Sequence, residues 1–145
     1  NGTALLLETS GPLANTEKVL EVINQLGSAS VKVCWNVRET FFSAKESADQ
    51  TIQTLGSYIG YVKLGDKKDN VDCLLGAGEL PVRDFLNALS SLNYDGFVSV
   101  LENDEIKSSD IVLTHFKSFL TINTRGLEEP INYNRSRSGT FPWKK

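Results

Sequence analysis

A short apolar run followed by a helix-forming segment occurs four times in this chain, and no other feature restricts its fold as strongly. The apolar runs are 4–8, 31–35, 61–64 and 97–101. Continuous apolar runs without alternation are typical of strands that are covered on both faces, as in a parallel sheet. The segments after them carry apolar residues at the i, i+3, i+4, i+7 spacing of one buried helix face. The repeat therefore predicts an α/β fold of four consecutive βα units with a parallel sheet and right-handed crossovers.

Capping residues mark the helix boundaries in this repeat. Ser, Asn and Asp accept hydrogen bonds from the free N–H groups of a first helical turn, and proline fits that turn. The expected helix starts are Asn15 or Thr16, Ser47 or Asp49, Pro81, and Ser108 or Ser109. Gly27 suits the end of the first helix. We expect Phe41 and Phe42 in a packed loop, and the polar run 67–72 in a solvated turn.

Four βα units amount to half of an eight-stranded (β/α)8 TIM barrel. An isolated half exposes two strand edges and an apolar inner face, and open edges pair readily with other strands. We therefore expect a partner for this sheet. The two alternatives are a second copy of the chain in a homodimer and a missing N-terminal half-barrel.

The composition excludes several classes of protein. The chain has 145 residues, enough for one domain, and its net charge of −3 provides no broad basic field for nucleic acid. No apolar run reaches the roughly 20 residues of a membrane-spanning helix. Cys34 and Cys73 lack C-x-x-C spacing, and reduced cysteines are typical of a cytoplasmic protein. Asn1 is not a start residue, so we expect a fragment of a larger polypeptide.

The sequence changes character after Thr124. Residues 125–145 contain two prolines and two glycines and show no helical period. Such a segment is typical of an extended linker or arm. Phe141 and Trp143 favour docking of this arm on the same domain or on a following one. The expected organisation is a half-barrel domain over 1–124 and an arm over 125–145 that leads to a downstream domain.

Polar residues follow the strands at their C-terminal ends, which share one rim in parallel α/β folds. The rim residues are Glu8, Asn36, Glu39, Lys63, Asp66 and Glu102. Carboxylates around one ammonium could hold a divalent cation or a polyol. The alternative is that they are polar residues where strands meet water. His115, the single histidine, is expected at the edge of an apolar helix face rather than in a catalytic site.

Two motifs in the second half of the chain carry a resemblance to a known family. The segments are L-G-A-G-E-L-P (75–81) and N-Y-D-G-F-V-S-V (93–100), with a helix between them. They resemble the motifs L-G-E-G-D-[IL]-P and G-Y-D-G-x-[VIL]-S-[VIL]-E of xylose-isomerase-like sugar phosphate isomerases and epimerases. The resemblance covers about residues 3–120 and implies the C-terminal half of a TIM barrel. The same superfamily includes the type IV apurinic endonucleases.

The resemblance implies a metal site, but most of its residues differ here. Glu8 matches the metal-binding glutamate that closes the family's fifth strand. After the sixth strand, Asn36 replaces an aspartate and Glu39 replaces a histidine. In the seventh, Lys63 replaces the second histidine, while Asp66 remains.

Three further positions also depart from the family pattern. Gly65 replaces the family's lysine, and Ala77 replaces the glutamate of the glycine-rich loop. The last strand's glutamate falls at Leu101, with Glu102 one residue later. A slip of one residue turns a side chain to the other face of a strand, so the metal role is not carried over to Glu102.

These substitutions lead to two main hypotheses of function. In the first, the chain is a degenerate, non-catalytic isomerase-like domain, a pseudoenzyme that acts as a binding or scaffolding module of a larger polypeptide. The ammonium of Lys63 would take the place of a cation beside Glu8 and Glu39, and no cofactor is expected. The tail R-S-R-S-G-T-F-P-W-K-K (135–145) resembles the lead-in to an AMP-binding acyl-CoA synthetase (ligase) domain.

The alternative is an active metal-dependent sugar phosphate isomerase or epimerase. Its ligands to Mn, Zn or Mg would be Glu8, Asn36 and Asp66, and its catalytic candidates Glu8, Glu39, Lys63 and Asp66. Such an enzyme uses a carboxylate as base and the metal as Lewis acid. A DNA-repair endonuclease is less favoured, because it needs several metal ligands and a basic groove.

Overall fold

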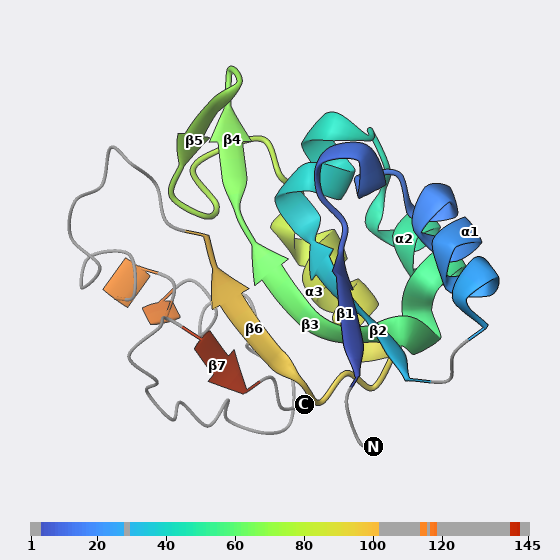
Figure 1. Cartoon of the computed structure of the whole chain (residues 1–145). Coiled ribbons are helices and arrows are strands. Elements are labelled where there is room, and N and C mark those ends of the chain that lie inside the picture. Colours follow the sequence, from blue (N-terminus) through green and yellow to red (C-terminus); the bar gives the residue numbers. More distant parts are fainter. Residues whose placement is uncertain (1–3, 28–29, 102–113, 116, 119–139, 143–145) are drawn as a thin grey trace.

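The computed structural model of the chain describes residues 4–27, 30–101, 114–115, 117–118 and 140–142. Within them, a five-stranded sheet has the order β1-β2-β3-β6-β7 (Figure 1). The four strands of the sequence repeat run parallel: β1 (Leu5–Glu8), β2 (Val31–Asn36), β3 (Ile59–Leu64) and β6 (Phe97–Val100). The predicted α/β fold with a parallel sheet of four strands, a partial TIM barrel, is confirmed.

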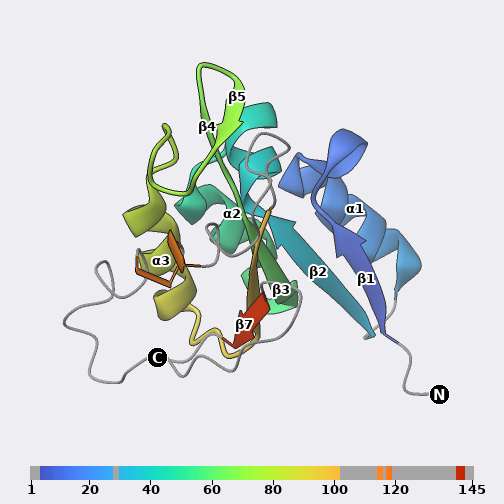
Figure 2. The same cartoon turned by 90° about the vertical axis from the view of Figure 1, so that its left-hand side faces the viewer.

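Three α-helices connect these strands and cover one face of the sheet (Figures 1 and 2). They are α1 (Thr16–Leu26), α2 (Ala48–Leu55) and α3 (Val82–Ser91). Single 3-10 turns lie at Gly11–Leu13 and Gly56–Tyr58. The side chain of Asn15 caps α1, and Gly27 ends it with φ 58°. Ser47 caps α2 by a reciprocal capping box with Gln50.

The core lies between the sheet and the helices. Its largest fully buried side chains are Trp35, Phe85, Leu55, Leu64 and Leu89. The rings of Trp35 and Phe85 lie 5.6 Å apart between centroids. Trp35 donates its indole N–H to the hydroxyl of Thr40 at 3.0 Å. The indole N–H of this buried side chain is therefore satisfied, as burial requires.

The two faces of the sheet differ because side chains alternate along each strand. Val33, Trp35, Val62, Leu64 and Val98 pack into the core beneath the helices. The residues between them point to the opposite face, here called the inner face. By strand register, the inner face carries Leu6, Glu8, Lys32, Cys34, Asn36, Tyr61, Lys63, Phe97 and Ser99.

Two segments that were predicted as loops are regular structure. The run after β3 forms an antiparallel ribbon of β4 (Asp66–Lys68) and β5 (Val71–Cys73) instead of a solvated turn. Asp69 and Asn70 turn the ribbon with φ 49° and 68°, and left-handed residue pairs of this kind form tight hairpins. Phe41 and Phe42 lie in a π-helical turn, Glu39–Ser43, rather than in a loop. The prediction that they are packed is correct, since both contact the core.

The C-terminal segment contributes one strand to the sheet. Strand β7 (Thr140–Pro142) pairs antiparallel with β6 at the edge of the sheet. Most of the predicted last helix, Trp143 and the rest of the predicted arm lie outside the described residues. The division into a domain over 1–124 and an arm over 125–145 stays a prediction.

Candidate functional site

An ion pair lies on the inner face, where two strands end. Glu8 is the last residue of β1, and Lys63 lies one residue before the end of β3. The ammonium of Lys63 donates a hydrogen bond to Oε1 of Glu8. Their side chains are 33% and 34% exposed, respectively, so the pair is open to solvent on one side. This pair joins two residues that the sequence predicted at the rim.

The ion pair shifts the pKa of both partners away from neutrality. The hydrogen bond from Lys63 lowers the pKa of Glu8, and partial burial opposes this effect. The same hydrogen bond raises the pKa of Lys63. Glu8 is therefore a carboxylate and Lys63 an ammonium throughout the physiological range.

Cys34 completes this group from the strand between the two charged residues. Its Sγ donates to Oε1 of Glu8 at 3.7 Å. Burial, with a smaller contribution from the Glu8 carboxylate, raises the pKa of Cys34 to about 11. A thiol with this pKa remains protonated at neutral pH and is a poor nucleophile. Cys34 therefore serves as a weak hydrogen-bond donor here.

A second polar pair lies on the same face. The hydroxyls of Tyr61 and Ser99 hydrogen-bond between β3 and β6. Ser99 lies directly opposite Lys63 in the register of these strands, and Tyr61 precedes Lys63 by two residues. Sequence reasoning did not single out Cys34, Tyr61 or Ser99 as site residues. The signal that could have found them is alternation, because they occupy inner-face positions of the predicted strands.

The other predicted site residues do not join this ion pair. Oδ1 of Asn36 accepts the backbone N–H of Glu39 at 3.3 Å. The carboxylate of Glu39 accepts the hydroxyl of Ser43 at 2.9 Å within its own π-helical turn. Glu102 lies outside the described residues. Asn36 and Glu39 thus form a separate local cluster after β2.

Asp66 is directed into the glycine-rich loop that precedes α3. It is 1% exposed, and its two oxygens accept four backbone N–H groups. The donors are Lys67 at 2.8 Å, Gly76 at 2.9 Å, Gly78 at 3.0 Å and Leu80 at 2.9 Å. A buried carboxylate with four such donors holds the loop in one conformation.

Gly78 is required by this arrangement. A Cβ built at this position would lie 2.4 Å from Oδ1 of Asp66 and 2.3 Å from the carbonyl oxygen of Lys67. Any larger residue would push the loop off the carboxylate. The glycine of the motif is therefore explained by close approach of two backbone segments.

Arg38 links the ribbon to the rim, and sequence reasoning missed it. Its Nη1 lies 3.2 Å from a carboxylate oxygen of Asp72 on β5. A Cβ at Gly65 would lie 3.2 Å from Cδ of Arg38, so the absence of a side chain at Gly65 gives the arginine room. The ion pair fixes the ribbon beside the C-terminal end of β2.

The carboxylates of the candidate site are poorly suited to bind a divalent cation, because they already have partners within the chain. Among the residues that the structure describes, no three His, Cys, Asp or Glu side chains lie close enough to hold a metal ion. A cation at Glu8 would compete with the Lys63 ammonium, and one at Asp66 with four N–H groups. Metal binding by Glu8, Asn36 and Asp66 stays a prediction that these contacts do not favour.

The single histidine has a structural contact. A ring nitrogen of His115 lies 2.7 Å from the carbonyl oxygen of Leu75. Leu75 opens the glycine-rich loop that surrounds Asp66. His115 thus supports this loop from a later part of the chain.

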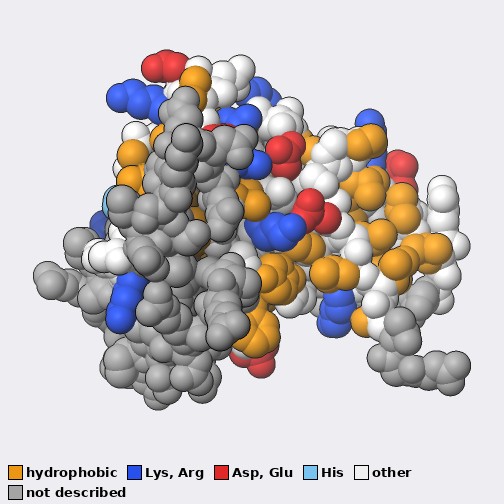
Figure 3. Space-filling model, turned by 60° about the vertical axis from the view of Figure 1, so that its left-hand side comes forward, with side chains coloured by type: hydrophobic (Ala, Val, Ile, Leu, Met, Phe, Trp, Pro, Cys, Tyr) orange, Lys and Arg blue, Asp and Glu red, His pale blue; other side chains and the backbone are white. Residues whose placement is uncertain are grey.

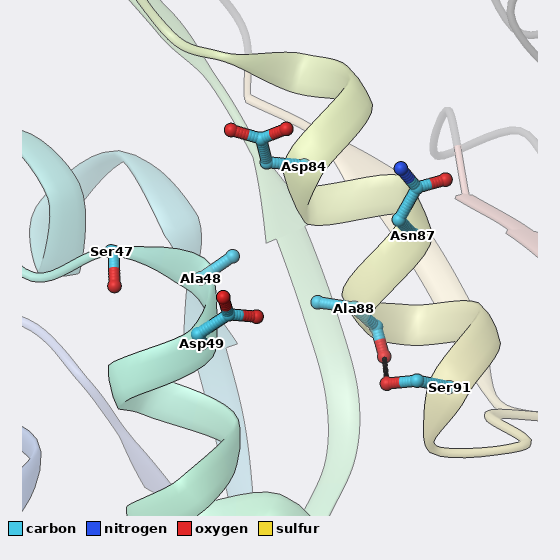
Figure 4. A pocket seen from close by; sticks show the side chains of 7 residues that line it. All are labelled: Ser47, Ala48, Asp49, Asp84, Asn87, Ala88 and Ser91. Atoms are coloured by element: carbon cyan, nitrogen blue, oxygen red, sulfur yellow. Dashed lines mark hydrogen bonds between the residues drawn. The ribbon is translucent and has the colours of Figure 1, made fainter.

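A polar cleft of about 350 Å³ lies elsewhere, between α2 and α3 on the outer layer. Asp49 and Asp84 face the space between the two helices (Figure 4). Two of its serines have structural partners: Ser47 caps α2, and Ser91 donates to the carbonyl of Ala88 at 2.7 Å. The cleft lies between two surface helices and shares no residue with the inner face.

The inner face combines these charges with apolar surface. Figure 3 shows acidic and basic side chains next to a group of hydrophobic ones on the face that comes forward. In the described part of the chain, the large apolar side chains that are most exposed include Leu6 and Phe97, both on this face. No helix among the described residues is long and apolar enough to cross a membrane.

Several solved structures share this fold. L-ribulose 3-epimerase matches with a TM-score of 0.68 and 17% identity over 89% of this chain and 53% of its own length. D-psicose 3-epimerase from Clostridium cellulolyticum H10 matches with a TM-score of 0.63 and 18% identity over 88% of this chain and 50% of its own length. A 3-keto-D-glucoside 4-epimerase from E. coli matches with a TM-score of 0.63 and 17% identity over 85% of this chain and 46% of its own length.

The chain spans about half the length of these structures. At such low identity the likeness shows the fold alone. A search of curated proteins finds no match. By sequence, residues 1–119 match the family described as xylose isomerase-like TIM barrel. The chain therefore belongs to the xylose isomerase-like TIM barrel family.

Proposed function

We propose that the rim around Glu8 and Lys63 binds a sugar or sugar phosphate without a divalent cation, and that the domain is a binding or scaffolding module. The observation that supports this proposal most directly is the hydrogen bond from Lys63 to Glu8. An ammonium neutralises the carboxylate from within the chain. A metal ion is then not needed to balance its charge.

The pair has the chemistry that polyol recognition needs. An ammonium has three donors, and the hydrogen bond to Glu8 uses one of them. A carboxylate accepts several hydrogen bonds. Sugar hydroxyls both donate and accept, so a vicinal diol fits a carboxylate next to an ammonium. The half-exposed Tyr61 side chain and exposed Phe97 offer adjacent apolar surface on the same face.

The same contacts give the pair little catalytic power. A carboxylate whose pKa is lowered is a weak base, and an ammonium whose pKa is raised holds its proton. General acid–base catalysis is most efficient when the pKa lies near the working pH. A Schiff base on Lys63 needs the free amine, which the Glu8 hydrogen bond disfavours. These arguments support binding without turnover.

The second candidate is an active metal-dependent sugar phosphate isomerase or epimerase. The observation in its favour is that the solved structures with this fold include several sugar epimerases. Glu8, Asn36 and Asp66 would be the metal ligands, with Glu39 as a further carboxylate. Mn, Zn or Mg would supply Lewis-acid chemistry. For this function, the ammonium of Lys63 would have to release Glu8. Asp66 would also have to release backbone N–H donors of the glycine-rich loop.

Calorimetry with ketoses separates the two functions. D-tagatose, D-psicose and L-ribulose are titrated into the chain in EDTA, and again with Mn²⁺ in excess. We expect the same dissociation constant in both buffers. Lys63→Met should weaken binding by about tenfold or more, the value of one charged hydrogen bond. Lys18→Met, on the exposed surface of α1, is the matched control.

Two results would contradict the proposal. The first is stoichiometric Mn²⁺ or Zn²⁺ on the purified chain, measured by elemental analysis, together with loss of sugar binding in EDTA. That result would favour the isomerase. The second is the absence of binding of any of these ketoses in either buffer at millimolar concentrations.

We further propose that the domain belongs to a larger polypeptide with a downstream acyl-CoA synthetase (ligase) domain. The support is the resemblance of residues 135–145 to the lead-in of such a domain. An antibody raised against the 145-residue chain should detect a much larger native polypeptide in cell extract. A native product of the size of this chain would contradict the proposal.

A further inference from the structure

The side-chain amide of Asn36 has a fixed orientation. Asn36 is the last residue of β2, belongs to the inner face by register, and is only 5% exposed. Its Oδ1 accepts the backbone N–H of Glu39 at 3.3 Å. A backbone N–H can only donate, so the oxygen of the amide must face it and the NH2 group must point away from it. The side chain therefore presents Nδ2, and not Oδ1, to the rest of the rim.

The NH2 group of Asn36 has no hydrogen-bond partner in the described part of the chain. The side chain makes one hydrogen bond there, which is the bond that Oδ1 accepts. Nδ2 is also not fully enclosed, because the fully buried side-chain atom without a partner is Nε of Arg38 among the described residues. Polar groups on a residue this deeply buried nearly always have a partner. Two free donors on such a side chain therefore point to a ligand.

Asn36 lies next to the Glu8–Lys63 ion pair. It is the register partner of Lys63 on the neighbouring strand β3, and adjacent strands lie roughly 4.8 Å apart. The hydroxyl of Thr9, the residue after Glu8, accepts the backbone N–H of Asn36 at 2.9 Å. This bond holds the end of β2 against the end of β1. The NH2 group and the ammonium are thus positioned to contact the same group of one ligand.

The free hydrogen-bonding groups at this position are mostly donors. An ammonium has three donors, and Lys63 gives one of them to Oε1 of Glu8. The NH2 group of Asn36 adds two more. Oε1 of Glu8 also accepts the Sγ of Cys34 at 3.7 Å, which leaves about two of the lone pairs of this carboxylate. The free donors therefore outnumber the free acceptors.

We propose that the ligand of this rim carries a carboxylate or phosphate group, and that the NH2 group of Asn36 and the ammonium of Lys63 hold this group. The inference rests on the proposed function, because it names the class of sugar that the same rim binds. An oxyanion accepts hydrogen bonds and donates none, so it satisfies the free donors. A sugar hydroxyl brings a donor with each acceptor. A sugar acid or a sugar phosphate therefore fits this position better than a neutral ketose.

The chemistry of the two donors favours an ionised acceptor. Hydrogen bonds to ionised groups are shorter and stronger than those between neutral groups. Lys63 already neutralises Glu8, so the repulsion between Glu8 and a second anion is reduced. The amide of Asn36 carries no charge of its own and turns its donors outward. An aspartate at this position would instead present an oxygen to the ligand and repel an oxyanion.

Asn36→Asp tests this inference, because it replaces only the NH2 group. The new carboxylate can still accept the N–H of Glu39, so the turn after β2 keeps its contact. Calorimetry in EDTA gives the dissociation constants of three matched ligands: D-tagatose, D-tagaturonate and D-tagatose 6-phosphate. EDTA keeps the new carboxylate from recruiting a metal ion.

In the native chain, we expect one of the two acidic ligands to bind at least about tenfold more tightly than D-tagatose. The tighter of the two identifies the group as a carboxylate or a phosphate. In Asn36→Asp, the dissociation constant of that ligand should rise by about tenfold or more, whereas that of D-tagatose should change by less than about threefold. Asn87→Asp, an exposed position on α3, makes the same change of charge on the outer layer. This control should leave all three constants unchanged.

A second measurement uses the native chain and does not depend on the folding of a variant. NMR spectra of the ¹⁵N-labelled chain follow the side-chain NH2 signals of Asn36 during each titration. The tighter acidic ligand should shift these signals, and D-tagatose should shift them much less. The NH2 signals of Asn87 should stay in place and serve as the internal reference.

Two outcomes would overturn this inference and leave the proposed function intact. Equal dissociation constants for D-tagatose and both acidic ligands would show that the rim does not select an oxyanion. An acidic ligand that binds the native chain and Asn36→Asp equally well, without a shift of the Asn36 NH2 signals, would place the oxyanion elsewhere. The absence of binding of all three ligands would contradict the proposed function and this inference together.

Discussion

Lys63 donates a hydrogen bond to Glu8 across 55 residues of sequence. The two residues belong to strands that are not neighbours, because β2 lies between β1 and β3 in the sheet. The side chains reach across this central strand above Cys34. This ion pair can therefore form only when β1, β2 and β3 are correctly aligned.

The first prediction concerns the pH dependence of stability. The pKa of Glu8 is lowered in the folded chain, so its contribution is present above its ordinary value of 4.5 and is lost as the pH falls through the folded pKa. The pKa of Lys63 is raised above 10.5, so its contribution is present below that value and is lost as the pH rises through the folded pKa. Solvent screening limits the pair to about 1 kcal/mol or less.

Glu8→Gln tests this pH dependence by urea denaturation. We expect the variant to lose up to about 1 kcal/mol at pH 7. It should approach the native chain as the pH falls through the lowered pKa of Glu8, where the native carboxyl also loses its charge. Glu21→Gln, on the exposed face of α1, is the control. Its free energy of unfolding should follow that of the native chain at every pH. A deficit of Glu8→Gln that grows as the pH falls would contradict the assignment.

The second prediction concerns the carboxylate of Asp66. Asp66→Asn replaces one acceptor oxygen by an amide group that faces backbone N–H donors. The variant leaves buried donors unsatisfied and should lower the free energy of unfolding by about 2–4 kcal/mol. Asp69→Asn, in the turn of the same ribbon, should change it by less than about 0.5 kcal/mol. Equal effects of the two substitutions would show that Asp66 does not organise the loop.

The third prediction concerns the close approach at Gly78. Gly78→Ala places a methyl group against the Lys67 carbonyl and the Asp66 carboxylate. We expect a loss of about 1–3 kcal/mol, as for overpacking in a core. Ala77→Ser adds one atom at the neighbouring exposed position and should have little effect. The slow hydrogen exchange expected for the N–H groups of Gly76 and Leu80 should be lost only in Gly78→Ala.

The fourth prediction concerns the two thiols. Burial raises the pKa of Cys34 to about 11, so at pH 8 only about one molecule in a thousand carries the thiolate. Cys73 is half-buried and should react first with a disulfide reagent. In Cys73→Ser, the remaining thiol should react only after unfolding in guanidinium. Rapid reaction of native Cys73→Ser at pH 8 would place Cys34 in a more open environment.

The parallel sheet could be predicted from the sequence because each strand and each helix carries its own local signal. Continuous apolar runs such as 31–35 and the capping residues Asn15 and Ser47 act within a few residues of the elements they define. Glu8 and Lys63 could be placed at the rim in the same way, because they lie at or near the ends of two predicted strands. Local patterns therefore sufficed for the order of elements and for one part of the site.

The remaining features depend on contacts that local patterns do not encode. Asp66 was expected at a metal site, but its oxygens meet N–H groups from residues up to 14 positions later. The backbone of that loop determines the contact, and no side-chain periodicity reports it. The ribbon after β3 was missed because its turn uses Asp69 and Asn70 rather than a glycine. Strand β7 was not predicted as a strand, because three residues with a proline give no strand signal.

The four N–H groups around Asp66 have a consequence for the response of the loop to its surroundings. Converging backbone N–H groups form anion sites in many proteins, and such sites usually fill and empty with the concentration of phosphate or sulfate. Here the anion is tethered to the chain, at an effective concentration that dissolved ions do not reach. The glycine-rich loop should therefore keep its shape in any buffer, and its order should be indifferent to phosphate.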